Sequence, residues 1–267
     1  MTKPQIIFLG NGPLADSALN ELQKHCEIIF HAHDQSDLTE VVKLKQKHPH
    51  AHAVLASFGV IITPDILEIF EPEGILNIHP SSLPRYRGPS PIESAILNGD
   101  TTFGTSVMKL APQMDAGPIY YQTTYTPDDP TRSDLKSHLY RTLASLGAQW
   151  LNKNFTQLPT PVKQNSNQAT FTKKLTKKDG ILEPDKHPAS VILHQIIAYQ
   201  GFPKPKYTLE GINCTILEAH LANPTDTPLL SIKCADGAKI AIDLLQPASR
   251  RPMDTKSFMN GLRKRQN

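Results

Sequence analysis

The first hundred residues alternate short apolar runs with segments in which apolar residues recur at helical spacing. The run 5–10 is rich in β-branched residues and ends at a glycine, so it predicts a buried strand. Leu14, Ala18 and Leu22 then recur at the spacing of one helix face. The same alternation predicts strands at 27–31, 53–57 and 74–78 and helices at 37–47 and 91–97. This order predicts an α/β fold with a doubly wound, Rossmann-like parallel sheet, which binds ligands at the carboxyl ends of its strands.

The pattern changes in the second half of the chain. Strands are predicted at 105–110 and 119–124, and apolar residues at near-helical intervals over 133–154 predict a long helix. Residues 156–170 lose this periodicity and are rich in Pro, Gln, Asn and Thr, as in a linker. A helix near 189–199 and short alternating runs at 215–219, 229–234 and 239–244 then favour a small C-terminal β-barrel, OB-like in kind. We therefore predict a first domain over 1–157, a linker over 158–171 and a smaller second domain over 172–267.

The composition indicates the cellular compartment and the kinds of site that the protein can contain. The three cysteines of the 267-residue chain are widely spaced and form no CxxC pair, which favours a reducing compartment and argues against a disulfide framework or a zinc site. The eleven histidines show no convincing ligand spacing, so we expect no bound metal. No apolar run approaches the roughly 20 residues that cross a bilayer. We expect a cytoplasmic protein without a membrane segment.

The charge balance is only mildly informative. A formal net charge of +3 and a pI near 8.6 permit a nucleic-acid partner without requiring one. The stretch 171–178 concentrates four lysines, but a solvated surface explains such a cluster equally well.

The candidate chemistry lies at the end of the strand predicted at 74–78. Asn77 and His79 are two residues apart, so both side chains can face one cleft as the strand ends. Asn77 offers amide donors, and the imidazole of His79 exchanges a proton near neutral pH. Asp115 lies in a Met-Asp-Ala-Gly loop and, placed beside His79, would orient the ring and favour its protonated form. Taken singly, the pair is also explained as a hydrogen-bonded strand end, and Asp115 as a turn residue.

Three motifs in order resemble the folate-dependent formyltransferases. The stretch Asn77–Gly88 is similar to that family's Asn-x-His-x-Ser-Leu-Leu-Pro-x-x-Arg-Gly pattern, with Ser82 in place of the first leucine. The loop Met114–Gly117 resembles the family's Leu-Asp-Thr-Gly, and Ala56–Ile61 resembles its Ala-Tyr-Gly-x-Ile-Leu segment.

The resemblance implies a mechanism. A substrate amine attacks the formyl carbon of 10-formyltetrahydrofolate, and Asn77 and protonated His79 donate hydrogen bonds to the oxyanion that forms. Asp115 holds His79 and helps relay the proton from the amine to the folate nitrogen. The loop expected to line the folate site comprises Ser81, Ser82, Leu83 and Pro84.

The C-terminal hundred residues resemble those members of the family that act on methionyl-tRNA. The segments that carry this likeness are Gly201–Pro205, Leu245–Met253 and Phe258–Gly261. The resemblance implies initiator methionyl-tRNA as the partner and a monomeric enzyme. Basic side chains of the second domain would then hold tRNA phosphates, namely Lys173, Lys174, Lys177, Lys178, Arg250 and Arg251.

One departure and two alternatives remain. The family usually has a longer basic loop after its second strand, whereas here Phe30–Asp34 leads almost directly into the next helix. This leaves open how initiator tRNA is distinguished from elongator tRNA. The alternatives are an N-formyltransferase for nucleotide-linked amino sugars and, from another class, a non-catalytic folate- or RNA-binding relative.

Overall fold

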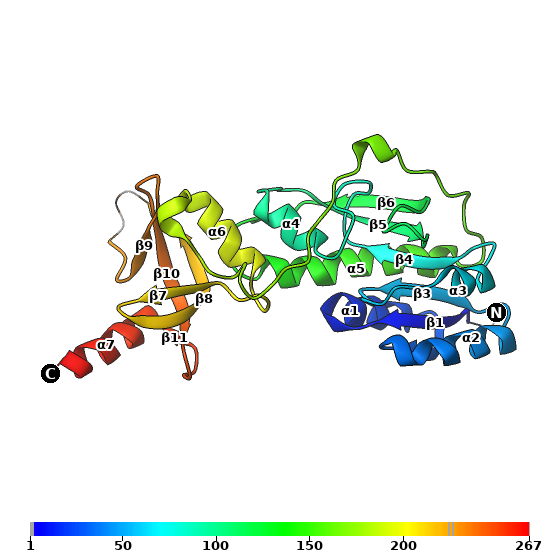
Figure 1. Cartoon of the computed structure of the whole chain (residues 1–267), viewed down its shortest axis with the longest axis horizontal. Coiled ribbons are helices and arrows are strands. Elements are labelled where there is room, and N and C mark those ends of the chain that lie inside the picture. Colours follow the sequence, from blue (N-terminus) through cyan, green and yellow to red (C-terminus); the bar gives the residue numbers. More distant parts are fainter. Residues whose placement is uncertain (1–2, 224, 226, 267) are drawn as a thin grey trace. The chain divides into compact units, whose positions relative to one another are not determined.

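The computed structural model describes residues 3–223, 225 and 227–266, with side chains described as far as Arg263. The chain divides into two compact units (Figure 1). Unit 1 comprises Met1–Ile92, Thr102–Thr126 and Ser137–Lys173, and unit 2 comprises Glu93–Thr101, Pro127–Lys136 and Lys174–Asn267. Unit 2 therefore gathers the C-terminal part of the chain together with two short segments of the first half.

Unit 1 is built on a six-stranded sheet with the order β2-β1-β3-β4-β5-β6. The first four strands run parallel, as predicted, and the last two pairings are antiparallel. The short connection between β5 and β6 explains their antiparallel pairing, since a parallel pair needs a crossover of a dozen or more residues. The strands are β1 (Gln5–Gly10), β2 (Glu27–Ala32), β3 (His52–Ala56), β4 (Ile75–His79), β5 (Phe103–Lys109) and β6 (Ile119–Tyr125).

Helices cover both faces of this sheet, which gives unit 1 two apolar cores. On one face, residues of α1 and α5 pack on Phe8, Val54 and Ile78. On the other face, residues of α2 and α3 pack on Ile7 and Leu55. Apolar side chains on both faces explain why these strands have nearly continuous hydrophobic runs. The helices of unit 1 are α1 (Gly12–Leu22), α2 (Leu38–Lys47), α3 (Pro64–Ile69) and α5 (Leu135–Asn154, from Ser137 onward), with 3₁₀ turns η1 (Gln35–Asp37) and η2 (Ser166–Gln168). Most of α4 (Pro91–Leu97) belongs to unit 2, which begins its first segment at Glu93.

Unit 2 carries an antiparallel sheet in the order β11-β10-β8-β7, with β9 paired to β10. The predicted strands correspond to β8, β9 and β10, and the predicted helix to α6, which packs against β8 and β10. The pattern did not predict β7, β11 or α7. The elements are η3 (Pro184–Lys186), α6 (Ala189–Ala198), β7 (Lys206–Leu209), β8 (Ile212–Leu221), β9 (Ser231–Lys233), β10 (Lys239–Pro247), β11 (Met253–Asp254) and α7 (Thr255–Gln266). The α/β class with a β-rich second part is thereby confirmed.

A buried ammonium group fixes the turn that precedes β7. Lys136 Nζ lies 3.0 Å from Glu93 Oε1 and donates to the carbonyl oxygens of Gln200 and Phe202, each at 3.0 Å. Both charged side chains are less than a tenth exposed. A buried charge is tolerated when it is paired and hydrogen-bonded, so this arrangement anchors the turn within unit 2.

Among the described helices, none is long and apolar enough to cross a membrane.

Candidate active site

The predicted pair Asn77 and His79 lies on β4, which is buried along its whole length. The two residues are 6% and 5% exposed, and they alternate with Ile78, which points into one apolar core. Within the part of the chain that the structure describes, the Asn77 amide has no hydrogen-bond partner. Among the described residues, Gln195 Oε1 alone is a fully buried side-chain nitrogen or oxygen atom without a partner, so the Asn77 amide keeps contact with solvent and its donors are open to a ligand.

The imidazole of His79 has a defined orientation. Its Nε2 donates to the backbone carbonyl of Tyr86 at 3.0 Å, and its Nδ1 lies 3.7 Å from Asp115 Oδ2. A carbonyl oxygen only accepts, so Nε2 carries a proton and Nδ1 is the nitrogen that faces the carboxylate. The structure thus brings together the histidine and the aspartate that the sequence singled out.

Asp115 is held in an unusual backbone conformation. Its φ angle is +47°, in the left-handed region, and its Oδ2 accepts the backbone N–H of Gly88 at 2.7 Å. Gly88 is itself at φ +117°, and a Cβ there would lie 2.6 Å from Thr172 Oγ1. A left-handed non-glycine residue persists only where its surroundings enforce it, and such residues cluster at functional sites.

Two buried side chains that the sequence analysis did not assign support the Asp115 loop. Gln164 Oε1 accepts hydrogen bonds from Arg87 Nε at 3.1 Å and Nη2 at 2.7 Å. The Nε2 of Gln164 donates to the carbonyls of Asp115 at 2.8 Å and Gly117 at 2.7 Å. Arg87 is 4% exposed and Gln164 7%. Arg87 stood in the quoted motif without a role, and Gln164 stood in the predicted linker, where composition carries no signal for a buried residue.

The end of the predicted linker and the first two residues of the predicted second domain are hydrogen-bonded to the loop that follows β4. Tyr86, at φ +60°, donates its N–H to Thr170 Oγ1 at 2.8 Å. Thr172 N donates to the carbonyl of Arg87 at 2.8 Å, and Ser90 Oγ donates to the carbonyl of Lys173. These bonds all lie within unit 1, so residues 170–173 are attached to the loop that carries Tyr86, whose carbonyl accepts from His79.

The predicted folate loop is held against β5 and β6. Ser106 Oγ donates to the carbonyl of Ser81 at 2.6 Å and accepts the N–H of Leu83 at 3.2 Å. Gln122 Nε2 donates to the carbonyl of Leu83 at 2.8 Å. Close approach is possible because residue 104 is glycine: a Cβ there would lie 1.9 Å from Ser82 Oγ. Ser81 and Leu83 are buried, whereas Ser82 and Pro84 are partly exposed. These hydrogen bonds hold the loop in place. The partly exposed residues Ser82 and Pro84 alternate with the buried residues Ser81 and Leu83.

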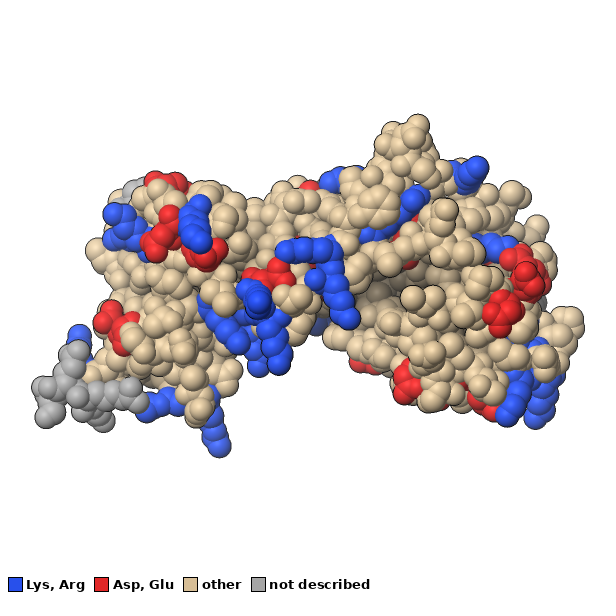
Figure 2. Space-filling view, viewed as in Figure 1, with Lys and Arg blue, Asp and Glu red and all other residues tan. Residues whose placement is uncertain are grey.

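The six basic residues predicted to hold tRNA are all exposed. Lys173 lies in unit 1, and Lys174, Lys177 and Lys178 lie in unit 2, as do Arg250 and Arg251. Figure 2 shows Lys and Arg side chains at several places on the visible face, with Asp and Glu side chains beside many of them. The exposure of the six predicted residues is explained equally well by phosphate binding and by a solvated surface. Among the described residues, no group of three or more His, Cys, Asp or Glu side chains is arranged to hold a metal ion.

Comparison with known proteins identifies the family. The profile described as "Formyl transferase" matches residues 18–155, and the profile "Formyl transferase, C-terminal domain" matches residues 174–263. A methionyl-tRNA formyltransferase of Roseiflexus castenholzii is 36% identical, over 79% of this chain and 70% of that protein.

Two solved structures share the fold. The methionyl-tRNA formyltransferase from Clostridium thermocellum superposes with a TM-score of 0.68 at 17% identity, covering 92% of this chain and 98% of that one. HypX from Aquifex aeolicus in complex with tetrahydrofolic acid gives 0.70 at 16% identity and covers 97% of this chain, which spans 47% of HypX. The resemblance inferred from the three motifs is confirmed: the chain belongs to the formyl transferase family.

Proposed function

We propose that this protein transfers the formyl group of 10-formyltetrahydrofolate to the amino group of initiator methionyl-tRNA. The observation that carries the proposal is the end of β4. There the nearly buried, unpartnered Asn77 amide lies two residues along the strand from His79, whose ring is held between the Tyr86 carbonyl and Asp115. This is the arrangement that acyl transfer requires: a donor for the developing oxyanion beside a positioned acid–base pair.

The proposed reaction follows from these groups. The amine nitrogen of the acceptor attacks the formyl carbon and forms a tetrahedral intermediate, whose oxyanion accepts hydrogen bonds from the Asn77 amide and from the Nδ1–H of protonated His79, because Nε2–H is bonded to the Tyr86 carbonyl. Asp115 and His79 relay the proton that the amine loses to N10 of the folate. The bond between the formyl carbon and N10 then breaks, which releases tetrahydrofolate and the formylated amine. The folate lies along Ser81, Ser82, Leu83 and Pro84.

The acceptor is proposed from the second unit and from the relatives. The profile for the family's C-terminal domain matches residues 174–263, and relatives at more than 30% identity are named methionyl-tRNA formyltransferases. The exposed basic residues from Lys173 onward supply positive charge for binding the phosphates of a tRNA. We propose that the enzyme that binds this tRNA is a monomer. The basic residues are Lys173, Lys174, Lys177, Lys178, Arg250 and Arg251.

The connection after β2 bears on the choice of tRNA. Only the residues around η1 join β2 to α2, and they are tied together by Asp34 and Asp37, whose carboxylates accept backbone N–H groups. This short, self-bonded connection carries no basic insertion. We therefore expect a smaller preference for initiator over elongator methionyl-tRNA than an enzyme with a long basic loop would show, measured as the ratio of the two kcat/KM values.

Transfer of labelled formyl from 10-formyltetrahydrofolate tests the proposed function. We expect transfer to charged initiator tRNA, and loss of it in Asn77→Ala. Transfer to a nucleotide-linked amino sugar without transfer to tRNA would make the protein an amino-sugar enzyme instead. Transfer to neither acceptor, with folate or RNA still bound, would identify a non-catalytic relative.

A further inference from the structure

The loop that follows β4 contacts both members of the proposed acid–base pair through its backbone. The carbonyl of Tyr86 accepts the hydrogen bond from His79 Nε2 at 3.0 Å, and the N–H of Gly88 donates to Asp115 Oδ2 at 2.7 Å. These two backbone groups belong to residues two apart in the chain. A displacement of the loop 86–88 therefore moves the hydrogen-bond partner of the imidazole together with that of the carboxylate.

The loop does not take this course by its own conformational preference. Tyr86 is at φ +60° and is only 7% exposed, although the left-handed region is unfavourable for a residue with a Cβ. Gly88 is at φ +117°, which is accessible to glycine. A left-handed tyrosine persists only where contacts from outside enforce it. These contacts come from the segment 170–173, which lies 82 to 84 residues further along the chain.

Two threonines of this segment bond to the loop through their hydroxyl groups. Thr170 Oγ1 accepts the N–H of Tyr86 at 2.8 Å, and Thr172 Oγ1 accepts the N–H of Ser90 at 3.2 Å. The backbones add two bonds. The N–H of Arg87 donates to the carbonyl of Thr170 at 2.9 Å, and the N–H of Thr172 donates to the carbonyl of Arg87 at 2.8 Å. The two hydroxyl groups therefore hold the loop on either side of Arg87.

The pairing of hydroxyls with backbone N–H groups fixes how the segment aligns with the loop. Side chains two residues apart in an extended segment share one face, so both threonines point to the loop, whereas Phe171 between them is 70% exposed. The fit is close at Gly88, where a Cβ would lie 2.6 Å from Thr172 Oγ1. A slip of the segment by one residue would turn both hydroxyls away from the loop.

We infer that Thr170 and Thr172 are positioning residues for the proposed formyl transfer. They hold the loop 86–88 where its backbone orients the His79 ring and the Asp115 carboxylate. The tautomer of a histidine is set by the hydrogen bond that one ring nitrogen makes, so the bond at Thr170 determines which nitrogen faces the reacting groups. The inference rests on the proposed function and deepens it, because it assigns control of the acid–base pair to a stretch at the predicted boundary between linker and second domain.

The variant Thr170→Val/Thr172→Val tests the inference, because valine has the shape of threonine without its hydroxyl group. The matched control is Thr156→Val/Thr160→Val, which removes two hydroxyls from exposed threonines that follow α5. We expect kcat to fall about tenfold in the first variant, as for a small misplacement of reacting groups. The KM values for 10-formyltetrahydrofolate and for tRNA should change less than twofold. The control should match the parent protein.

Serine separates the hydroxyl from the rest of the side chain. Thr170→Ser/Thr172→Ser keeps both hydrogen-bond acceptors and loses two methyl groups, so its kcat should lie within twofold of the parent value. If serine does not restore kcat, or if the valine variant keeps the parent kcat, the inference is wrong.

The His79 ring provides a second readout, which does not depend on turnover. In protein with ¹⁵N-labelled histidine rings, the His79 signals are assigned by their absence in His79→Gln. At pH 9, well above the ordinary pKa of an imidazole, they report which ring nitrogen carries the proton. The parent protein should carry it on Nε2, which donates to Tyr86, whereas the single variant Thr170→Val should share it between both nitrogens. A lower kcat with parent-like ring signals would make the threonines structural only and overturn the inference.

The positioning role and the proposed function fail in different ways. If the ring signals change in Thr170→Val but the parent protein transfers no formyl group to methionyl-tRNA, the proposed function fails and the positioning of His79 by Thr170 stands. If the parent protein transfers formyl groups, and both kcat and the ring signals are unchanged in every threonine variant, the positioning role alone is wrong.

Discussion

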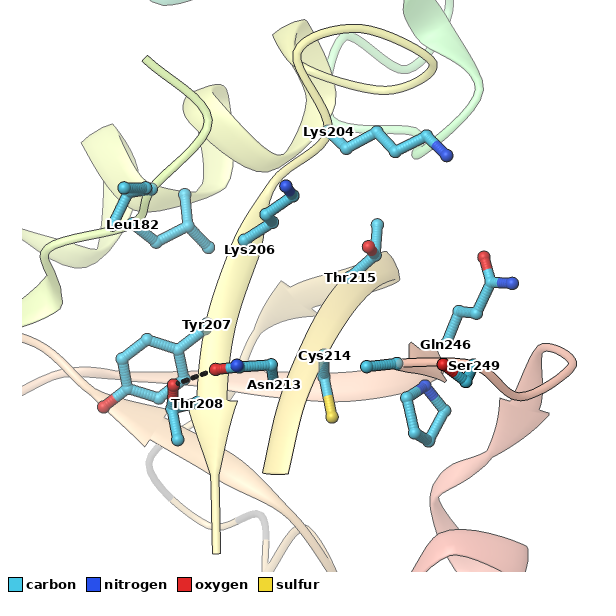
Figure 3. Close-up of a pocket in the computed structure, with 13 residues that line it drawn as sticks. Leu182, Lys204, Lys206, Tyr207, Thr208, Asn213, Cys214, Thr215, Gln246 and Ser249 are labelled. Carbon is cyan, nitrogen blue, oxygen red and sulfur yellow. Dashed lines mark hydrogen bonds between the residues drawn. The ribbon is translucent and has the colours of Figure 1, made fainter. Parts of the chain in front are cut away.

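The region around His79 and a groove of unit 2 arrange polar side chains in opposite ways. Around His79 the polar groups are buried and bonded mainly to one another, down to Arg87 and Gln164 beneath the Asp115 loop. In the groove, which lies on the face of β7 and β8 (Figure 3), the polar groups face an open space of about 670 Å³. Bond-making requires reacting groups held within fractions of an ångström. The buried, mutually bonded groups around His79 therefore suit the proposed formyl transfer, whereas the open groove presents its polar groups to solvent.

Both regions also contain a left-handed residue, and the use of each differs. Asp115 at φ +47° directs its carboxylate inward, to the Gly88 N–H and towards His79. Lys204 at φ +77° directs its ammonium group outward over the groove. A left-handed backbone thus directs a carboxylate towards His79 in unit 1 and an ammonium group outward in unit 2 (Figure 3).

The largest expected effect comes from Asn77. Replacing it by alanine removes the donor with no protein partner, and kcat for formyl transfer should fall by about 10²–10³, as for loss of one oxyanion donor. Single-turnover rates with bound tRNA isolate the chemical step. Turnover within threefold of the parent protein would remove Asn77 from the chemistry.

A smaller effect is expected for Gln164, which contacts the Asp115 loop rather than the reacting groups. Gln164→Ala leaves the buried Arg87 guanidinium and two loop carbonyls without their partner, which should cost about 2–3 kcal/mol of stability. Displacement of Asp115 should lower kcat about 10- to 100-fold. The matched control is Gln168→Ala, an exposed glutamine of the same segment, which should change neither Tm nor kcat.

If Gln164→Ala lowers Tm without lowering kcat, the network is structural only. Rescue of kcat by Gln164→Glu, which can still accept from Arg87, would show that the arginine contact matters more than the two carbonyl contacts.

The salt concentration should affect tRNA binding and the chemical step differently. Raising salt from 50 to 200 mM should raise KM for tRNA by at least tenfold, because phosphate contacts release counterions. The kcat at saturating tRNA should change less than twofold, since the charges around His79 are buried. A parallel fall in kcat would mean that the chemistry depends on exposed charge as much as the binding does.

The smallest effect concerns two cysteines, one in each unit. Burial raises the pKa of the Cys26 thiol to about 11 and that of Cys234 also to about 11, from 9.0. Both should therefore alkylate slowly at pH 8, as mass spectrometry of native and unfolded protein can show. Unfolded thiols ionise at lower pH than the folded ones, so stability should fall as pH rises from 9 towards 11. Rapid native labelling of one thiol would show that its unit opens locally.

The elements with strong periodicity were predictable from sequence, and the short or irregular ones were not. The runs that became β1 and β4 end at glycine or at a proline break, and their boundaries differ from prediction by at most one residue. In contrast, α3 and β7 are too short to establish a period. Because β7 was not predicted, its polar pairing with β8 and hence the groove could not be predicted either.

The site shows the same division. Asn77, His79 and Asp115 stand in ordered motifs, and the structure places His79 and Asp115 within 3.7 Å. Gln164 could not be found in this way, since its bond to Arg87 joins residues far apart in the chain. Nothing in a Pro-, Gln- and Thr-rich stretch distinguishes a buried glutamine from an exposed one.

The hydrogen bonds made by Gln164, Thr170 and Thr172 determine where the chain can be divided into fragments that keep unit 1 intact. A fragment that stops at residue 157, where the long helix has ended, would lack the partner of Arg87 and the acceptor for the Tyr86 N–H. A fragment carried through Lys173 would retain both. For dissection, circular permutation or fusion to another acceptor-binding module, the usable junction therefore begins after these threonines. The stretch before them belongs to unit 1 and is bonded to the loop that follows β4.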